Sequence, residues 1–130
     1  MSTKRSDRYA PAPVGSRTTL IAATCTDCAR VSFPVTDRCP ACAGTLTPIT
    51  LAGPARLSVL TAVLAQPPGA LISAPYDVGV ADFEEGIRII GLVDEPAERG
   101  DLVVPVVIAP HPEVETFAFR RVAAGHPAEI

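Results

Sequence analysis

The residues best suited to chemistry in this sequence are four cysteines, arranged as two Cys-x2-Cys pairs: Cys25, Cys28, Cys39 and Cys42. Four thiolates on two facing turns form a tetrahedral cage, which is the geometry that Zn²⁺ prefers in a closed structural site. Iron can occupy the same S4 geometry, and two disulfides would also use four cysteines. We predict a structural zinc ion, because the chain shows no other redox feature and no cysteine is left for catalysis.

Other chemically active residues do not form a recognisable catalytic set. The sequence contains no Gly-x-Ser-x-Gly elbow, P-loop or dinucleotide fingerprint. His111 and His126 both stand beside prolines, which favours surface loops over metal ligation. Asp82, Glu84 and Glu85 surround an expected hairpin turn, where solvated carboxylates are ordinary. We therefore expect no catalytic residues in this chain.

Composition and charge narrow the class of protein. The chain has 130 residues, of which 48% are hydrophobic, with 14 prolines and 9 glycines, a mixture that favours short strands over long helices. The net charge is -3, which argues against a broad nucleic-acid surface. Residues 1–38 carry six basic and three acidic side chains, or +3, so the remainder carries -6. This basic N-terminal segment can bind an acidic partner surface or a phosphate group, and Arg17, Arg30 and Arg38 are the candidate contacts.

The start of the chain predicts the cellular compartment. The first twenty residues lack the apolar core of a signal peptide, and no apolar run approaches the length of a membrane span. We therefore expect a cytoplasmic protein without a membrane association. Thiols stay reduced in the cytoplasm, which favours a metal over disulfides.

Around the cysteines, the sequence predicts a small ribbon of short strands. Strands are expected at residues 18–24 and at Val31–Phe33 between the two cysteine pairs. Residues 45–51 are expected to lead out of the ribbon toward the second part of the chain. Phe33 is expected to pack across the metal site, and Gly44 to adopt a positive φ as the chain leaves the second turn. Residues 1–17 are polar and proline-containing, and predict a flexible or extended arm.

The second half of the chain predicts a five-stranded barrel. The strands are expected at residues 56–65, 76–83, 86–93, 103–108 and 116–122. Five short strands in about 65 residues suit an OB-type Greek-key barrel, whereas immunoglobulin-like sandwiches need about seven. Pro105 predicts an edge or a bulge in the fourth barrel strand, and a single helical turn is expected near 96–100. The apolar loop 66–75 is a candidate partner or ligand surface.

We therefore predict a mainly β protein, in which a rubredoxin-like zinc ribbon precedes an OB-fold barrel. The expected division is a flexible arm at 1–17, the ribbon at 18–50, the OB-fold at 51–122 and a tail at 123–130.

With both parts placed, residues 20–122 resemble the zinc-ribbon/OB-fold proteins associated with thiolases and acyl-CoA enzymes, once catalogued as domain of unknown function thirty-five. The resemblance in the ribbon includes the four cysteines together with Phe33, Pro34 and Pro40. In the barrel the matching positions are Thr61, Pro67-Pro68-Gly69, Pro75-Tyr76, Glu85-Gly86-Ile87-Arg88, Gly100 and Phe119-Arg120. The chain departs from the family pattern at Ala29, which replaces a glycine, at Val35-Thr36, which replace Pro-Arg, and at Ala70.

The resemblance implies a non-catalytic accessory subunit. Such a subunit binds a thiolase-like or acyltransferase-like enzyme and helps hold its CoA thioester, and some relatives instead join a hotdog-fold hydratase. A heterotetramer with two copies of each subunit is expected, because thiolases are themselves commonly dimers. The alternative from a different class is a single-stranded nucleic-acid-binding OB module with a structural zinc ribbon. Residues of this chain that contact CoA are not indicated by the resemblance.

Overall fold

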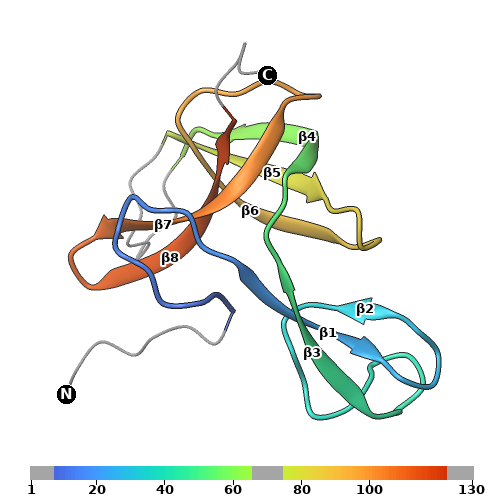
Figure 1. Ribbon diagram of the computed structural model, residues 1–130. Helices are drawn as coiled ribbons and strands as arrows, with labels where there is room; N and C mark the ends of the chain where they lie inside the picture. Colours follow the sequence, from blue (N-terminus) through green and yellow to red (C-terminus); the bar gives the residue numbers. More distant parts are fainter. Residues whose placement is uncertain (1–7, 66–74, 123–130) are drawn as a thin grey trace.

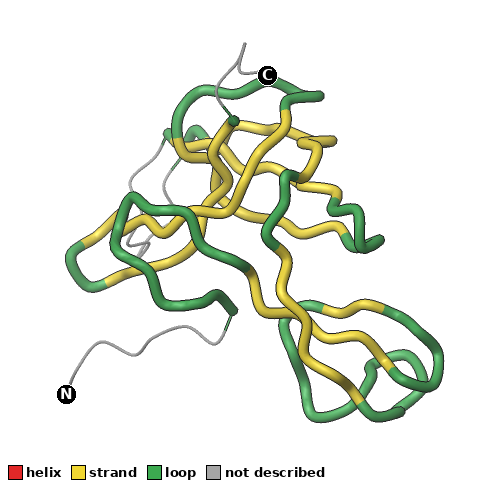
Figure 2. Tube along the Cα trace, in the orientation of Figure 1, coloured by secondary structure: helices red, strands yellow, loops and turns green. Residues whose placement is uncertain are grey.

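The computed structural model describes residues 8–65 and 75–122, and within them every regular element is a strand. The diagram in Figure 1 shows a small three-stranded sheet beside a barrel, and Figure 2 shows the loops that join their strands. In chain order the strands are β1 (Leu20–Cys25), β2 (Val31–Ser32), β3 (Leu46–Leu51), β4 (Ala55–Val63), β5 (Tyr76–Asp82), β6 (Arg88–Asp94), β7 (Leu102–His111) and β8 (Val114–Arg121). The mainly β prediction is confirmed.

The small sheet has the strand order β2-β1-β3, with both pairings antiparallel. β1 and β3 pair along their whole lengths, from Leu20 opposite Leu51 to Cys25 opposite Leu46. The first cysteine therefore lies at the end of the sheet that is far from the barrel, while Leu20 and Leu51 lie at the near end (Figure 1).

The barrel is closed and has the strand order β4-β5-β6-β8-β7. All of its pairings are antiparallel except that between β6 and β8. The parallel ladder is short, running from Leu92 opposite Ala118 to Asp94 opposite Arg120. The first halves of β6 and β8 lie outside this ladder, a feature that shapes the groove described below.

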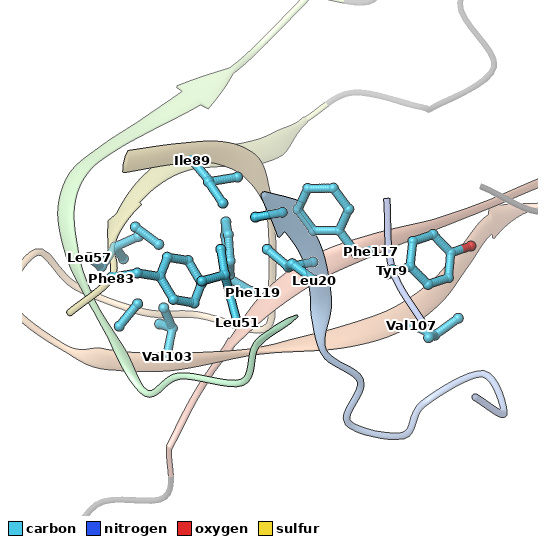
Figure 3. Close-up of a cluster of buried hydrophobic side chains, with 13 residues drawn as sticks. Tyr9, Leu20, Leu51, Leu57, Phe83, Ile89, Val103, Val107, Phe117 and Phe119 are labelled. Carbon is cyan, nitrogen blue, oxygen red and sulfur yellow. The ribbon is translucent and has the colours of Figure 1, made fainter. Parts of the chain in front are cut away.

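One hydrophobic core serves both the ribbon and the barrel. Leu20 and Leu51 from the small sheet belong to the same buried cluster as Leu57, Ile89 and other barrel residues. Phe117 and Phe119 of β8 supply large side chains to this cluster, with ring centroids 5.7 Å apart in an edge-to-face arrangement (Figure 3). The near end of the ribbon is thus packed into the barrel core.

The described part of the arm is packed, which corrects the expectation of a flexible segment at 1–17 for residues 8–17. Tyr9 is only 1% exposed, and its hydroxyl donates a 2.8 Å hydrogen bond to Glu115. Farther along, the Gly15 N–H donates to the Val107 carbonyl at 2.7 Å, and the Thr18 N–H donates to the Pro105 carbonyl at 3.0 Å. The arm therefore covers one side of β7, as Figure 1 shows.

This packing explains how Pro105 fits into β7. β4 pairs with β7 only near its start, at Leu102 and Val103, so Pro105 lies beyond the barrel ladder on that side. A proline cannot donate a backbone hydrogen bond and is tolerated where no ladder partner needs one. The arm bonds only to the carbonyl of Pro105, which accepts a hydrogen bond from the Thr18 N–H, and needs no donor from the proline. The expected edge position is confirmed, although the arm covers that edge.

The helical turn expected near 96–100 is wrong. These residues form a hydrogen-bonded turn, in which the Asp101 N–H donates to the Glu98 carbonyl and the Glu98 N–H donates to the Asp101 carboxylate at 2.9 Å. Gly100 has a φ of 95°, a left-handed conformation that ends any helical progression. Pro96 and Gly100 thus leave room for a turn only.

Several expectations fall on residues that are not described. The loop at 66–75 lies outside the described residues except for Pro75, and His126 and the tail at 123–130 lie outside them entirely. Among the described residues, no helix has the length and apolar character to cross a bilayer.

Candidate metal centre and adjoining groove

The two cysteine turns are built to carry negative charge on sulfur. In the first turn, the N–H groups of Asp27 and Cys28 donate to Cys25 Sγ at 3.3 and 3.4 Å. In the second turn, the Ala41 N–H donates to Cys39 Sγ at 3.4 Å. Hydrogen bonds of this kind favour the thiolate form over the thiol. The first cysteine of each pair is therefore preorganised as an anionic ligand.

The structure brings the four sulfur atoms together within 4.8 Å of one another. Cys25 Sγ lies 3.5 Å from Cys42 Sγ, and Cys28 Sγ lies 3.7 Å from Cys39 Sγ. All four cysteines are free, so the disulfide alternative does not describe this structure. Zn–S bonds of about 2.3 Å in a regular tetrahedron place the sulfur atoms about 3.8 Å apart. The observed spacing therefore fits a zinc ion without rearrangement.

The thiols differ in acidity before any metal binds. Backbone N–H donors from Ala41 and Cys42 lower the pKa of Cys39 to about 7. The N–H of Cys28 is the main cause of a lowered pKa at Cys25. The neighbouring Cys25 sulfur, by contrast, raises the pKa of Cys42 to about 12, because a second negative charge so close is unfavourable. A divalent cation removes that repulsion.

The backbone leaves each cysteine turn through an alanine in the left-handed conformation. Ala29 has a φ of 65° and Ala43 a φ of 63°, each directly after the second cysteine of its pair. The expectation that Gly44 adopts the positive φ is therefore wrong by one residue. Gly44 is needed for a different reason, since a Cβ there would lie 2.9 Å from Cys25 Sγ and would also clash with the Asp27 carboxylate.

Phe33 does not cap the metal site as expected. Its ring packs edge-to-face against Phe117 of β8, with centroids 5.8 Å apart, and it contacts the shared core. The side chain thus connects the loop between the two cysteine turns to the barrel. In so small a ribbon, the nearest large apolar surface is the barrel itself.

A groove lies where this loop meets the barrel. It has a volume of about 580 Å³ and lies between the first halves of β6 and β8, where those strands are not paired. Its walls include Phe33, Pro34, Ile90, Leu92, Phe117, Arg8 and Arg88. Nothing in the sequence marks this groove in advance, because it depends on two strands diverging in space.

The arginines expected to contact a phosphate do not line this groove. Arg17, Arg30 and Arg38 are all exposed, Arg17 on the arm and the other two near the cysteine turns. Arg38 donates a long, 3.5 Å hydrogen bond to the carbonyl of Ala43. Arg88, which the sequence offered as part of a family motif and as the basic residue of the nucleic-acid alternative, is the arginine that β6 brings to the groove.

The outer face of the barrel carries an apolar row. Val59 of β4 is opposite Val80 of β5, which in turn is opposite Ile90 of β6. Val59 is 47% exposed and Ile90 is 69% exposed. The next row pairs Val78 with Leu92, so the apolar surface extends along the strands.

The acidic cluster near the β5–β6 turn has a structural use. Asp82 accepts 3.0 Å hydrogen bonds from both Ser58 Oγ and Arg88 Nε. Glu84 and Glu85 are exposed at the turn, where Gly86 has the expected positive φ of 92°. His111 ends β7, and its Nδ1 accepts a hydrogen bond from the Glu113 N–H at 3.0 Å. These carboxylates and this histidine do not meet in a common site.

A four-thiolate ribbon packed against a five-stranded Greek-key barrel defines a zinc-ribbon/OB-fold protein. Residues 16–47 match the family described as "ChsH2, rubredoxin-like zinc ribbon domain", which confirms the ribbon and identifies its ion as structural zinc. The resemblance drawn from the sequence motifs is supported over this segment.

Comparison with solved structures supports the same fold over most of the chain. A structure titled "Ltp2-ChsH2(DUF35) aldolase" contains a chain that superposes with a TM-score of 0.65 at 24% sequence identity. The match covers 81% of this chain and 86% of the other. No curated protein matches the sequence.

Proposed function

We propose that this chain is a non-catalytic accessory subunit that binds a thiolase-like or acyltransferase-like enzyme and helps to hold its CoA thioester. The similar solved structure supports this proposal, because its title places a ChsH2 (DUF35) chain together with Ltp2 in an aldolase. Within the proposal, Cys25, Cys28, Cys39 and Cys42 hold the zinc ion and have no part in the chemistry. The ion stabilises the ribbon, as closed S4 zinc sites do.

The observation that carries the proposal is the apolar row in which Val59 and Ile90 are exposed and Val80 between them is half-buried. Large contiguous apolar surfaces on soluble proteins commonly mark interaction sites. The row crosses three adjacent strands of the closed barrel, so its side chains form one continuous surface that another protein can contact. We propose that this face contacts the partner enzyme, in two copies of each subunit.

Co-purification with the enzyme tests this assignment. The chain and the thiolase-like enzyme encoded in the same host are expressed together, and a tag on the enzyme is used for capture. We expect Val59→Glu to weaken the complex at least tenfold, because it places a charge in an apolar interface. Val14→Glu is the matched control, since Val14 is 57% exposed but lies on the arm beside β7.

The proposal fails if the two wild-type proteins elute separately, or if Val59→Glu and Val14→Glu both co-purify like the wild type. A thioester assay on the isolated chain adds a second test, because turnover by this chain alone contradicts a non-catalytic role. Cytoplasmic location remains a prediction that fractionation of the host cell can test.

The nucleic-acid alternative has less support from the barrel surface. OB folds that bind single strands use stacked aromatics and a basic groove. The outward face of β5 and β6 carries Val78, Val80, Ile90 and Leu92, with one aromatic, one arginine and two aspartates toward the strand ends: Tyr76, Arg88, Asp82 and Asp94. Tight, salt-sensitive binding of single-stranded DNA or RNA in an anisotropy titration would favour this alternative instead.

A further inference from the structure

The groove between β6 and β8 has the size and wall chemistry of a small-molecule site. Its volume of about 580 Å³ falls within the usual range for ligand pockets. Most of its walls are apolar, and its charged side chains are Arg8 and Arg88. Among the described residues that line it there is no carboxylate, although Asp82 beside the groove pairs with Arg88. Two cationic side chains among mainly apolar walls favour an anionic ligand.

The wall formed by β6 also offers backbone donors. Phe83 and Ile87 form a hydrogen-bonded pair, because the Phe83 N–H donates to the Ile87 carbonyl at 2.9 Å. Hydrogen-bonded and non-hydrogen-bonded pairs alternate along an antiparallel ladder, so Arg88 and Ile90 stand in non-hydrogen-bonded pairs with β5. By that alternation, Arg88 and Ile90 direct their N–H and C=O groups away from β5. The ladder with β8 begins only at Leu92, so among the described strands none pairs with these groups. Backbone N–H groups of this kind can bind anionic oxygens.

Arg88 is placed to bind a ligand while remaining in position. Its Nε donates to Asp82 at 3.0 Å, and its terminal nitrogens form no hydrogen bond or ion pair with the described residues. An arginine held through Nε keeps a second pair of donors for a phosphate or carboxylate. Arg8 comes to the same groove from the arm, which is anchored by the buried Tyr9.

We propose that this groove binds a phosphate-bearing ligand with an apolar arm. The phosphate oxygens are held by Arg8, Arg88 and the free N–H groups of β6, and the arm lies against Phe33, Ile90 and Phe117. Two guanidinium groups from separate elements match the several oxygens of a phosphate better than a single carboxylate. The choice of CoA as the probe rests on the proposed function. The proposal adds which residues of this chain contact CoA, which the family resemblance did not indicate.

Titration calorimetry on the full-length, zinc-loaded protein tests the site. Four ligands are titrated separately. They are CoA, inorganic phosphate, octanoate and pantetheine, the last of which has the apolar arm of CoA but none of its phosphates. We expect CoA to bind in a 1:1 ratio and pantetheine to bind at least tenfold more weakly. We expect Arg8→Gln and Arg88→Gln each to weaken CoA binding by roughly tenfold, the value of one lost charge-assisted contact. Arg99→Gln is the control, because Arg99 is exposed in the β6–β7 turn outside the groove.

Circular dichroism and thermal unfolding of each variant establish that a loss of binding is not a loss of fold. The proposal is overturned if both groove variants bind CoA like the wild type, if pantetheine binds as tightly as CoA, or if octanoate is preferred. It is also overturned if CoA binds neither the chain alone nor its co-purified complex. Ile90 belongs to both the apolar row and the groove wall, so the two proposals are separated by residues that they do not share: Val59 does not line the groove, and Arg8 and Arg88 are not part of the row. Val59→Glu can therefore abolish complex formation while CoA binding persists, and the arginine variants can do the reverse.

Discussion

Ala29 and Ala43 each follow a cysteine turn with a left-handed backbone, at φ values of 65° and 63°. An L-residue in this conformation is strained by roughly 1–2 kcal/mol, and glycine is not. Replacing such an alanine with glycine removes this strain, but part of the gain in stability is lost, because glycine raises the conformational entropy of the unfolded chain. The sequence correctly indicated a positive φ near the exit of the second turn, but it could not separate that need from the crowding that requires Gly44.

We predict that Ala43→Gly raises the free energy of unfolding by about 0.5–1 kcal/mol. Gly44→Ala should do the reverse and weaken zinc binding, because its Cβ would press on Cys25 Sγ. Urea unfolding of the zinc-loaded proteins measures the first effect, and competition with a chelator measures the second. A loss of stability in Ala43→Gly would contradict the strain argument.

We predict that zinc affinity rises with pH between 6 and 8. With a pKa of about 12 in the absence of metal, Cys42 holds its proton at neutral pH, and zinc must displace it. Below pH 7 the Cys39 thiolate, whose pKa is about 7, is also lost, so affinity should then fall more steeply. Chelator competition at several pH values, with proton release measured in weak buffer, checks this. An affinity independent of pH over that range would exclude four-thiolate binding.

Among the elements, the short parallel ladder between β6 and β8 is reinforced by one arginine. Arg120 donates to Asp94 Oδ2 through Nε at 3.1 Å and through its terminal nitrogen at 2.6 Å. A further donor reaches the Gly15 carbonyl of the arm at 3.1 Å. Arg120 therefore ties β8, β6 and the arm together, and the family motif Phe119-Arg120 has a structural explanation in this chain.

We predict that Arg120→Ala lowers the free energy of unfolding by about 1–2 kcal/mol, and that Arg120→Lys recovers only part of it. Arg88→Ala is the control, since its ion pair is exposed and should contribute less than about 0.5 kcal/mol. Denaturant unfolding curves compare the three variants. Equal effects of Arg120→Ala and Arg88→Ala would show that Arg120 has no special structural role.

The strands were predictable within a few residues because Gly and Pro mark their ends. β5 was expected at 76–83 and is observed at Tyr76–Asp82, and the Gly86 turn stands where it was placed. The path of the arm and the groove could not be predicted. Both depend on surfaces that form only when distant segments meet, such as Tyr9 with Glu115.

For the whole molecule, the shared core decides how the ribbon and barrel unfold. Leu20 and Leu51 of the ribbon are fully buried in the same cluster as Phe119 of the barrel. Two independent domains would each have a core of their own. A boundary near residue 50, as the sequence suggested, therefore separates two shapes but not two cores.

We predict a single cooperative thermal transition, with equal calorimetric and van't Hoff enthalpies. Removal of zinc should lower the midpoint of this one transition, because loosening the ribbon also exposes part of the barrel core. Differential scanning calorimetry with and without a chelator measures both. Two separate transitions, with only one sensitive to the chelator, would contradict a common core.

The segment between Cys28 and Cys39 serves two sites at once. Its ends are fixed by sulfur atoms that must meet around one ion, and Phe33 and Pro34 in its middle form a wall of the groove. The segment can thus exchange its exposed side chains freely, but its length is constrained from both directions. An insertion or deletion there would displace the groove wall even if the ion kept all four of its sulfur ligands.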